Sequence, residues 1–208
     1  MASWSAKFFG EEDIYYDSLQ HSTPIELHQS LHDLLNETDV VVTYNGKRFD
    51  LPWVQSGFVT YGLPPPKPFK HIDLLHVVRR QFKFPSNKLE YVVKALGIGE
   101  KMPNEGFELW KKCMAGDKEA WAIMEEYNIH DTALLEALYD RVLPYITNHP
   151  NRSIVDGLVC PSCGSTHYKK EGFATTKASR YQQYSCKDCG SWFRGNENLA
   201  PKEKYLPV

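Results

Sequence analysis

The sequence predicts an α/β domain followed by a small second domain built around paired cysteines. Three observations predict this architecture. Apolar β-branched runs alternate with amphipathic stretches over residues 1–147, a polar linker follows at 148–155, and two Cys-x-x-Cys pairs lie within 156–196. Residues 197–208 form a tail. A chain of 208 residues is long enough for one substantial core and one small appended unit.

The beginning of the first domain predicts two strands, a helix and a third strand. Ser3–Phe9 and Asp13–Asp17 are short strand patterns separated by a turn. A capping box from Thr23 to Glu26, with proline at the first helical position, predicts a helix through Asn36. Asp39–Tyr44 is a short run rich in valine, which is typical of a buried parallel strand.

Helical patterns dominate the rest of the first domain, and the longest has Asp117 as its expected N-cap. They span about 51–61, 74–82, 88–96, 106–114 and 118–146. The alternation of strands with helices is typical of an α/β domain. The polar stretch from Thr147 to Ser153 ends the last helical pattern, as a linker does.

Charge is divided unevenly along the chain. The net charge is -2, but residues 1–150 hold 15 Lys and Arg against 21 Asp and Glu, whereas residues 151–208 hold 9 against 5. A basic second part is attracted to phosphate backbones, although a solvated surface gives the same balance. Because no apolar run approaches membrane-spanning length and the opening residues lack a secretory pattern, we expect no membrane association and a cytoplasmic location.

Four cysteines carry the strongest motif of the sequence. Cys160 and Cys163 form one Cys-x-x-Cys pair, Cys186 and Cys189 form another, and glycine follows each pair. Such turns bring two thiolates onto one metal, and four thiolates select zinc in a tetrahedral shell. Two disulfides are the alternative, which a cytosolic setting disfavours. Since four bound thiolates leave no open coordination position, the zinc is expected to be structural.

Aromatic and basic side chains surround the second cysteine pair. They are Arg180, Tyr181, Tyr184, Lys187, Trp192, Phe193 and Arg194. The pattern from Tyr184 to Arg194 resembles the zinc ribbons of transposases and other nucleic-acid enzymes. Rings and positive charge together can stack bases and bind phosphates. Packing of the ribbon's own small core and docking of a protein remain the alternatives.

Two segments of the first domain predict chemistry. In the first, Asn45-Gly-Lys-Arg-Phe-Asp50 places a carboxylate just beyond a buried strand, at the edge where ligands gather in open α/β sheets. In the second, Tyr127 and Asp131 lie four residues apart on the long helix, so the phenol and the carboxylate share one face. Asp50, Asp131 and Tyr127 are therefore the candidate catalytic residues.

These segments resemble the second and third motifs of the DEDDy 3′–5′ exonucleases, in the bacterial YprB-like branch of the ribonuclease-H-like superfamily. Tyr127 and Asp131 match the third motif. The second motif is matched by Asn45, Gly46, Phe49, Asp50 and Pro52. The resemblance covers most of residues 3–147 and implies a ribonuclease H-like mixed sheet with flanking helices.

The resemblance implies hydrolysis of nucleic-acid phosphodiester bonds with two Mg²⁺ or Mn²⁺ ions. By resemblance, Asp50 and Asp131 are ligands of these ions and Tyr127 orients the attacking water. Asn45 and Asn87 are expected to bind the substrate or support the site. Single-stranded 3′ ends are the expected substrate, and the sequence leaves DNA and RNA both open.

The family's first motif, an Asp-x-Glu on the opening strand, has no counterpart in the sequence. Glu11, Glu12 and Asp13 are acidic and early, but they lie in the turn after the first strand pattern. An upstream peptide or a partner chain is expected to supply the motif, and we favour a split or internally started enzyme. The alternative is a catalytically inactive nuclease fold that only binds nucleic acid or a partner.

Overall fold

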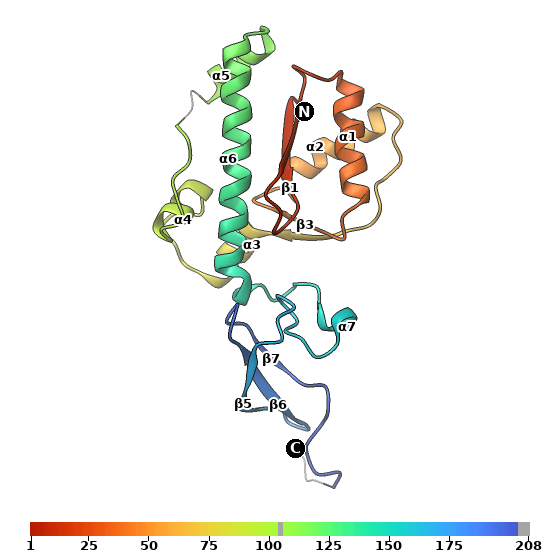
Figure 1. Ribbon diagram of the computed structural model, residues 1–208, viewed down its shortest axis with the longest axis vertical. Helices are drawn as coiled ribbons and strands as arrows, with labels where there is room; N and C mark the ends of the chain where they lie inside the picture. The colour runs from red at the N-terminus through yellow and green to blue at the C-terminus, as the bar shows by residue number, and fades with distance from the viewer. Residues whose placement is uncertain (104–105, 204–208) are drawn as a thin grey trace. The chain divides into compact units, whose positions relative to one another are not determined.

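The computed structural model describes residues 1–103 and 106–203, in two compact units, Met1–Tyr139 and Asp140–Val208 (Figure 1). The elements in chain order are β1 (Ser3–Lys7), β2 (Ile14–Ser18), α1 (Pro24–Asn36), β3 (Val40–Thr43), α2 (Asp50–Thr60), β4 (Lys70–Asp73), α3 (Leu74–Gln81), α4 (Leu89–Ala95), α5 (Phe107–Met114), α6 (Lys118–Val142), the 3-10 turn η1 (Leu143–Tyr145), α7 (Ser153–Asp156), β5 (Tyr168–Thr175), β6 (Arg180–Cys186) and β7 (Trp192–Arg194).

The strands of the first unit form one antiparallel and one parallel pair. β1 pairs with β2 as a hairpin, and β3 pairs with β4 in parallel. Within the described residues the two pairs are separate two-stranded sheets, so β1 and β3 each pair along one edge only. Mixed strand pairing among helices confirms the predicted α/β class. The sequence did not predict β4, in which Ile72 is the one buried apolar side chain.

Helix ends follow the predicted chemistry in two places. Thr23 Oγ1 accepts from the Glu26 N–H, and the Glu26 carboxylate accepts from the Thr23 N–H at 2.8 Å, which completes the capping box of α1. Asp117 Oδ1 accepts from two N–H groups at the start of α6. α6 ends at Val142, earlier than expected, because Pro144 lacks an N–H and the chain tightens into η1.

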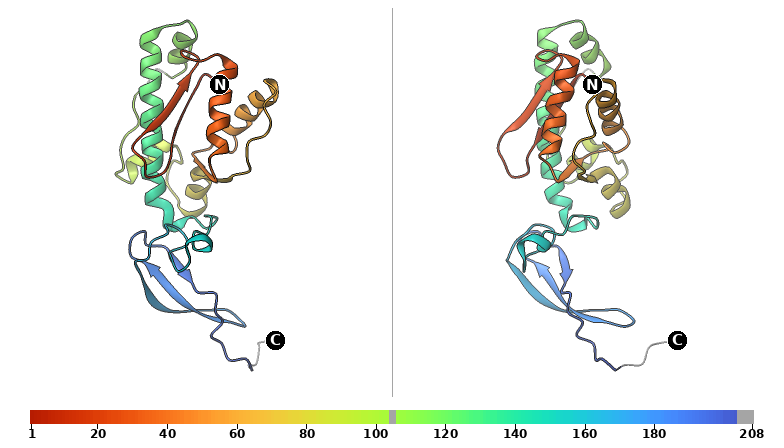
Figure 2. Two further views of the ribbon diagram at one scale, coloured as in Figure 1. Left: turned by 45° about the vertical axis from the view of Figure 1, so that its right-hand side comes forward. Right: turned by 90° about the vertical axis from the view of Figure 1, so that its right-hand side faces the viewer.

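Two apolar clusters support the elements that carry the site. One joins α1 to α2, which lie side by side in both views of Figure 2, through Leu35, Val54 and Phe58. The other joins α5 to α6 and includes Cys113 and Trp121. Both helices of each pair therefore have buried faces that fix their orientation. No helix among residues 1–103 and 106–203 combines the length and apolarity that a membrane crossing requires.

Gly57 provides the closest approach between α1 and α2. A Cβ at Gly57 would lie 2.1 Å from Nε2 of His28, a buried side chain whose Nδ1 donates to the Pro24 carbonyl at 2.6 Å. We expect Gly57→Ala to destabilise the first unit by about 1–3 kcal/mol, despite the better helix propensity of alanine, because this histidine is buried and held by its hydrogen bond to Pro24. Urea unfolding followed by circular dichroism measures the change.

Ser56→Ala is the matched control because Ser56 lies on the same helix with its side chain at the surface. It is expected to leave the free energy of unfolding within about 0.5 kcal/mol of the wild type. A Gly57→Ala chain as stable as the wild type contradicts the assigned packing of α2 on α1.

Candidate functional site

α6 lies beside β1 (Figures 1 and 2), and polar contacts along one face of the helix hold it there. Ser5 Oγ donates to the Asn128 carbonyl at 2.9 Å and hydrogen-bonds the Thr132 hydroxyl at 2.6 Å. Farther along, Lys7 forms an ion pair with Glu136. Residues spaced by four share a helix face, so these contacts set the rotation of α6 about its axis.

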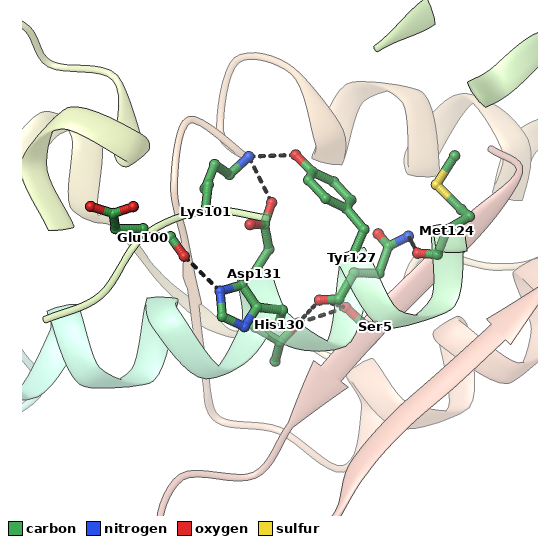
Figure 3. Close-up of polar contacts among 9 residues, drawn as sticks. Ser5, Glu100, Lys101, Met124, Tyr127, His130 and Asp131 are labelled. Atoms are coloured by element: carbon green, nitrogen blue, oxygen red, sulfur yellow. Dashed lines mark hydrogen bonds and ion pairs between the residues drawn. The ribbon is translucent and has the colours of Figure 1, made fainter. Parts of the chain in front are cut away.

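The predicted pair Tyr127 and Asp131 lies on a neighbouring face of α6, where Lys101 joins them (Figure 3). Lys101 Nζ is 2.8 Å from Asp131 Oδ2, donates to the Tyr127 hydroxyl, and lies 4.8 Å from the centre of the Tyr127 ring. The side chains of Lys101 and Asp131 are each 24% exposed, so the ion pair is partly shielded from water. As their spacing predicts, the phenol and the carboxylate lie side by side.

The segment of residues 97–103, which carries this lysine, is fixed to α6. His130 Nε2 donates to the Glu100 carbonyl at 2.8 Å (Figure 3). Gly99 lies so close to the helix that a Cβ there would be 2.9 Å from Leu134 Cδ2. The position of the ammonium therefore depends on backbone contacts as well as on its ion pair.

The ion pair with Lys101 engages one carboxylate oxygen of Asp131, the Oδ2 atom. Its Oδ1 atom is buried and has no hydrogen-bond partner within the described part of the chain. A buried acceptor is costly unless a water, an ion or a ligand pairs with it. Desolvation acts to lower the pKa of Lys101, but the hydrogen bonds and charges of Asp131 and Tyr127 outweigh it and raise that pKa. The lysine therefore stays protonated at neutral pH.

A tight turn after β3 carries Asn45. Asn45 has a φ of 68°, in the left-handed region that asparagine tolerates better than most residues. The Asp73 carboxylate accepts from the backbone N–H groups of Asn45 at 2.9 Å and Lys47 at 3.1 Å, and also caps α3. A Cβ at Gly46 would lie 2.5 Å from Thr43 Oγ1, so this turn requires glycine. Asp73, which is not among the predicted site residues, organises the turn.

The remaining predicted residues lie near this turn and at the start of α4. Asp50 begins α2 and is exposed, yet desolvation by the surrounding protein raises its pKa, and the charge of Asp73 adds to the increase. The Asn87 carbonyl accepts from the Tyr44 hydroxyl at 2.7 Å, and Asn87 Oδ1 is buried without a hydrogen-bond partner in the described residues. Asn87 therefore offers a second unpaired oxygen.

The contacts gather the candidate residues into two groups. Asp131, Tyr127 and Lys101 form one, and Asp50 interacts with Asp73 in the other. Over residues 1–103 and 106–203, the four cysteines are the single group of three or more His, Cys, Asp or Glu side chains close enough to hold a metal ion. The carboxylates therefore form no preassembled cage for a pair of ions.

The second unit brings the four predicted cysteines together. All four Sγ atoms lie within 4.8 Å of one another, with 3.8 Å between Cys160 and Cys189 and 3.7 Å between Cys163 and Cys186. A tetrahedron with zinc–sulfur bonds of about 2.3 Å has sulfur–sulfur edges of about 3.8 Å, whereas a disulfide is about 2.05 Å long. The thiols are free, and their spacing matches a metal shell rather than disulfides.

The two cysteine pairs have matching backbone turns. The Gly164 N–H donates to the Cys160 carbonyl at 2.9 Å, and the Gly190 N–H donates to the Cys186 carbonyl at 3.2 Å. Both glycines have positive φ, 80° and 76°, which explains why glycine follows each pair. The local turns thus preset two thiols each, and the fold brings the pairs together.

β5, β6 and β7 form an antiparallel sheet beside these turns. Tyr168, Tyr184 and Phe193 pack together on it, with Tyr184 and Phe193 stacked at 5.4 Å, so these rings form the small core. Strand register puts Trp192 and Arg194 on the opposite face from Tyr184 and Phe193. Trp192 is 59% exposed there, and the Arg194 guanidinium lies 4.1 Å from the centre of the Tyr181 ring.

Comparison with known proteins relates the first unit to nucleases. The RNase_H_2 family, of the RNase_H superfamily, matches residues 8–143. YprB of Bacillus subtilis strain 168, described as uncharacterized, is 38% identical over 104 residues, which cover 44% of this chain and 23% of YprB. The chain thus spans about a quarter of the length of that relative.

Among solved structures, the family B DNA polymerase of the hyperthermophilic archaeon Pyrobaculum calidifontis matches with a TM-score of 0.51 at 17% identity. The match covers 65% of this chain and 20% of the polymerase. At this identity the likeness concerns the fold, and it agrees with the ribonuclease H-like architecture that the family match indicates.

Proposed function

The chain belongs to the RNase_H_2 family of the RNase_H superfamily, and on this premise we propose that its first unit is a metal-dependent 3′–5′ exonuclease of the DEDDy type. The observation that carries the proposal is that Lys101 joins Tyr127 and Asp131 on α6, while the other Asp131 oxygen is buried and has no hydrogen-bond partner among the described residues. Proteins of this superfamily hydrolyse phosphodiester bonds, and perturbed or unpaired polar groups at such a position support a functional site.

Asp131 fits a hard divalent cation because its free Oδ1 is an anionic oxygen in a shielded place. We assign Asp131 as a ligand of Mg²⁺ or Mn²⁺ and Asp50 as a second carboxylate for the ion. When bound, such an ion activates water and neutralises charge on the leaving oxygen. The Tyr127 phenol orients the attacking water, which loses a proton as its oxygen bonds to phosphorus, while the P–O3′ bond breaks and the leaving oxygen gains a proton. Asn45 and Asn87 are assigned to the substrate.

The second unit is proposed to be a structural zinc ribbon that binds nucleic acid. Sulfur–sulfur distances of 3.7 and 3.8 Å support tetrahedral zinc. The exposed Trp192 and the neighbouring Arg194–Tyr181 pair support base stacking and phosphate contact on one face of the sheet. We also propose that a peptide or partner chain can pair with the free edges of β1 and β3 and supply further carboxylates.

The test uses the full chain, loaded with zinc, and a single strand labelled at its 5′ end. The proposed activity yields a ladder of strands shortened from the 3′ end, and only with Mg²⁺ or Mn²⁺ present. Binding without shortening favours the inactive binding module. Shortening that begins when a peptide with an Asp-x-Glu strand is added favours the split enzyme.

Trp192→Ala is expected to weaken binding of a single strand by about 10-fold, since stacking of one base on an aromatic ring contributes roughly 1–3 kcal/mol. Fluorescence anisotropy of a labelled oligonucleotide measures the affinity. Trp110→Ala is the control because Trp110, on α5 of the first unit, is also a partly exposed tryptophan. Equal affinities of the Trp192→Ala and wild-type chains, with equal zinc content, contradict the stacking role.

A further inference from the structure

Positive side chains gather in the middle of the first unit. Residues 40–99 hold 9 Lys and Arg against 3 Asp and Glu, whereas the rest of residues 1–150 hold 6 against 18. Ion pairs engage two of the nine, Lys67 and Lys94. Within the described part of the chain the other seven form no ion pair. The middle of a negatively charged unit therefore keeps a surplus of unpaired positive charge.

Four of these side chains border the turn after β3, and we call them the basic patch. They are Lys47, Arg48, Arg79 and Lys88, and all four are exposed. Lys47 and Arg48 lie in the turn itself. The hydrogen bond from the Tyr44 hydroxyl to the Asn87 carbonyl brings the start of α4, with Lys88, to the same place. Burial raises the pKa of Tyr44 to about 12, and the charge of Arg79 opposes the increase, so Arg79 also lies near this phenol.

A large exposed ring lies beyond the same turn. Trp53 belongs to the first turn of α2, and its side chain is 65% exposed. It follows Asp50 by three residues, and residues three apart lie on one side of a helix, with about 5–6 Å between their Cβ atoms. An indole that is open to solvent can stack any of the bases, since every base has a π-face. The first unit therefore presents unpaired positive charge and a stacking surface on the two sides of Asp50.

We propose that the basic patch and Trp53 form a binding site for a single strand of nucleic acid on the first unit, in addition to the face proposed on the ribbon. The patch contacts phosphates of the strand, and the Trp53 indole stacks a base next to the bond that is cut. The inference rests on the nuclease function proposed above, because it gives the strand a path past Asp50.

The combination of charge with an open ring favours a single strand over a duplex. In a duplex the bases stack on one another, and a positive surface meets mainly the phosphates. The Trp53 indole gains a partner only from a base whose face is free, as in a single strand. A duplex would therefore use the patch without the ring, and this difference can be measured.

The experiment measures the affinity of a labelled single strand by fluorescence anisotropy over a series of salt concentrations, without Mg²⁺ or Mn²⁺ so that the strand stays intact. The zinc-loaded full chain carries Trp192→Ala throughout, which reduces the contribution of the ribbon. Arg48→Gln combined with Arg79→Gln is expected to lower the slope of log affinity against log salt by about 1.4, since each phosphate contact on a single strand contributes roughly 0.7. Lys67→Gln, which removes an ion-paired lysine of the same stretch, is the matched control and keeps the slope.

Trp53→Ala in the same background is expected to bind the single strand about 10-fold more weakly. The salt slope should stay unchanged because the indole carries no charge, and the affinity for a duplex of the same sequence should also stay unchanged. Trp110→Ala, at another partly exposed tryptophan of the first unit, is the control and keeps both affinities. Phosphates and base faces are common to DNA and RNA, so strands of both kinds are titrated, and the tighter one identifies the sugar that the site prefers.

An unchanged salt slope in the double arginine variant, or an unchanged single-strand affinity of Trp53→Ala, overturns the inference, while trimming by the wild type would still support the nuclease function. Equal losses on the single strand and the duplex in Trp53→Ala also overturn it, because the indole would then support the fold rather than stack a base. A chain that meets both expectations but trims no strand with Mg²⁺ or Mn²⁺ contradicts the nuclease function instead and keeps the strand-binding site.

Discussion

Replacement of Asp131 by asparagine is expected to reduce 3′-end trimming by about 1000-fold, which corresponds to roughly 4 kcal/mol of transition-state stabilisation. Asparagine keeps the shape of the side chain and retains one oxygen that can accept from Lys101. It removes the negative charge that a divalent ion requires, and it places either an amide or a neutral oxygen where the buried Oδ1 lies. Single-turnover trimming of a labelled strand at saturating Mg²⁺ measures the effect on chemistry.

The fold should survive this change because the ion pair between Lys101 and Asp131 is partly exposed and contributes on the order of 1 kcal/mol or less. Asp33→Asn, at a largely exposed carboxylate on α1, is the matched control and should trim at the wild-type rate. A folded Asp131→Asn chain that retains a tenth or more of the wild-type rate would be incompatible with a metal-ligand role for Asp131.

Elements whose ends are defined by local side chains could be predicted from the sequence. The capping box at Thr23 and the Asp117 cap satisfy N–H groups within three residues of themselves, so their effect is visible in a short window. The sequence does not predict β4 because the pairing of this strand is not local. Lys70 pairs with Val40 across an intervening helix, and Ile72 is the one buried apolar residue of the strand. Strand formation there depends on the partner rather than on its own pattern.

The same distinction applies to the candidate site. Tyr127 and Asp131 could be placed together because four residues make about one helical turn. Lys101 reaches Asp131 from 30 residues upstream, and neither its neighbours nor their spacing form a recognisable motif. Asp73 has no sequence signal of this kind, because its role is to accept from backbone N–H groups of another segment. Contacts that are made by single residues across the fold leave no periodic trace in the sequence.

The cysteine site can be predicted although its two pairs are far apart in the sequence. The coordination chemistry of zinc indicates which distant residues must come together. Each pair is a local turn, and a tetrahedral thiolate shell requires two pairs. The structure brings Cys160 near Cys189 and Cys163 near Cys186, as one shared centre demands. The sequence predicts the surface around the cysteine site less well. The aromatic residues near the second cysteine pair divide between a packed core and an exposed face. Strand register decides that division, and register depends on tertiary pairing.

Loss of the metal is expected to unfold the ribbon of residues 156–196 while the first unit stays folded. Apart from the thiols, the sheet is supported mainly by the rings of Tyr168, Tyr184 and Phe193, a core too small to offset the chain entropy of three strands. Structural zinc contributes about 10–16 kcal/mol of apparent binding free energy in small zinc-finger peptides, so its removal exceeds any plausible stability of the ribbon. We expect Cys163→Ala to release the zinc and to abolish hydrogen-exchange protection across β5–β7.

Cys113→Ala separates loss of a ligand from loss of a cysteine, because Cys113 packs in the first unit with Leu109 and Trp121. This control should retain one zinc per chain and full protection of the ribbon. Hydrogen exchange with mass spectrometry measures the protection of both units in one sample. The protection of α6 is the internal reference for a first unit that stays folded. Persistent protection of β6 in a zinc-free Cys163→Ala chain would mean that packing alone holds the sheet. In that case the basic and aromatic face would be formed without a metal. The four converging thiols argue against a sheet that folds without zinc.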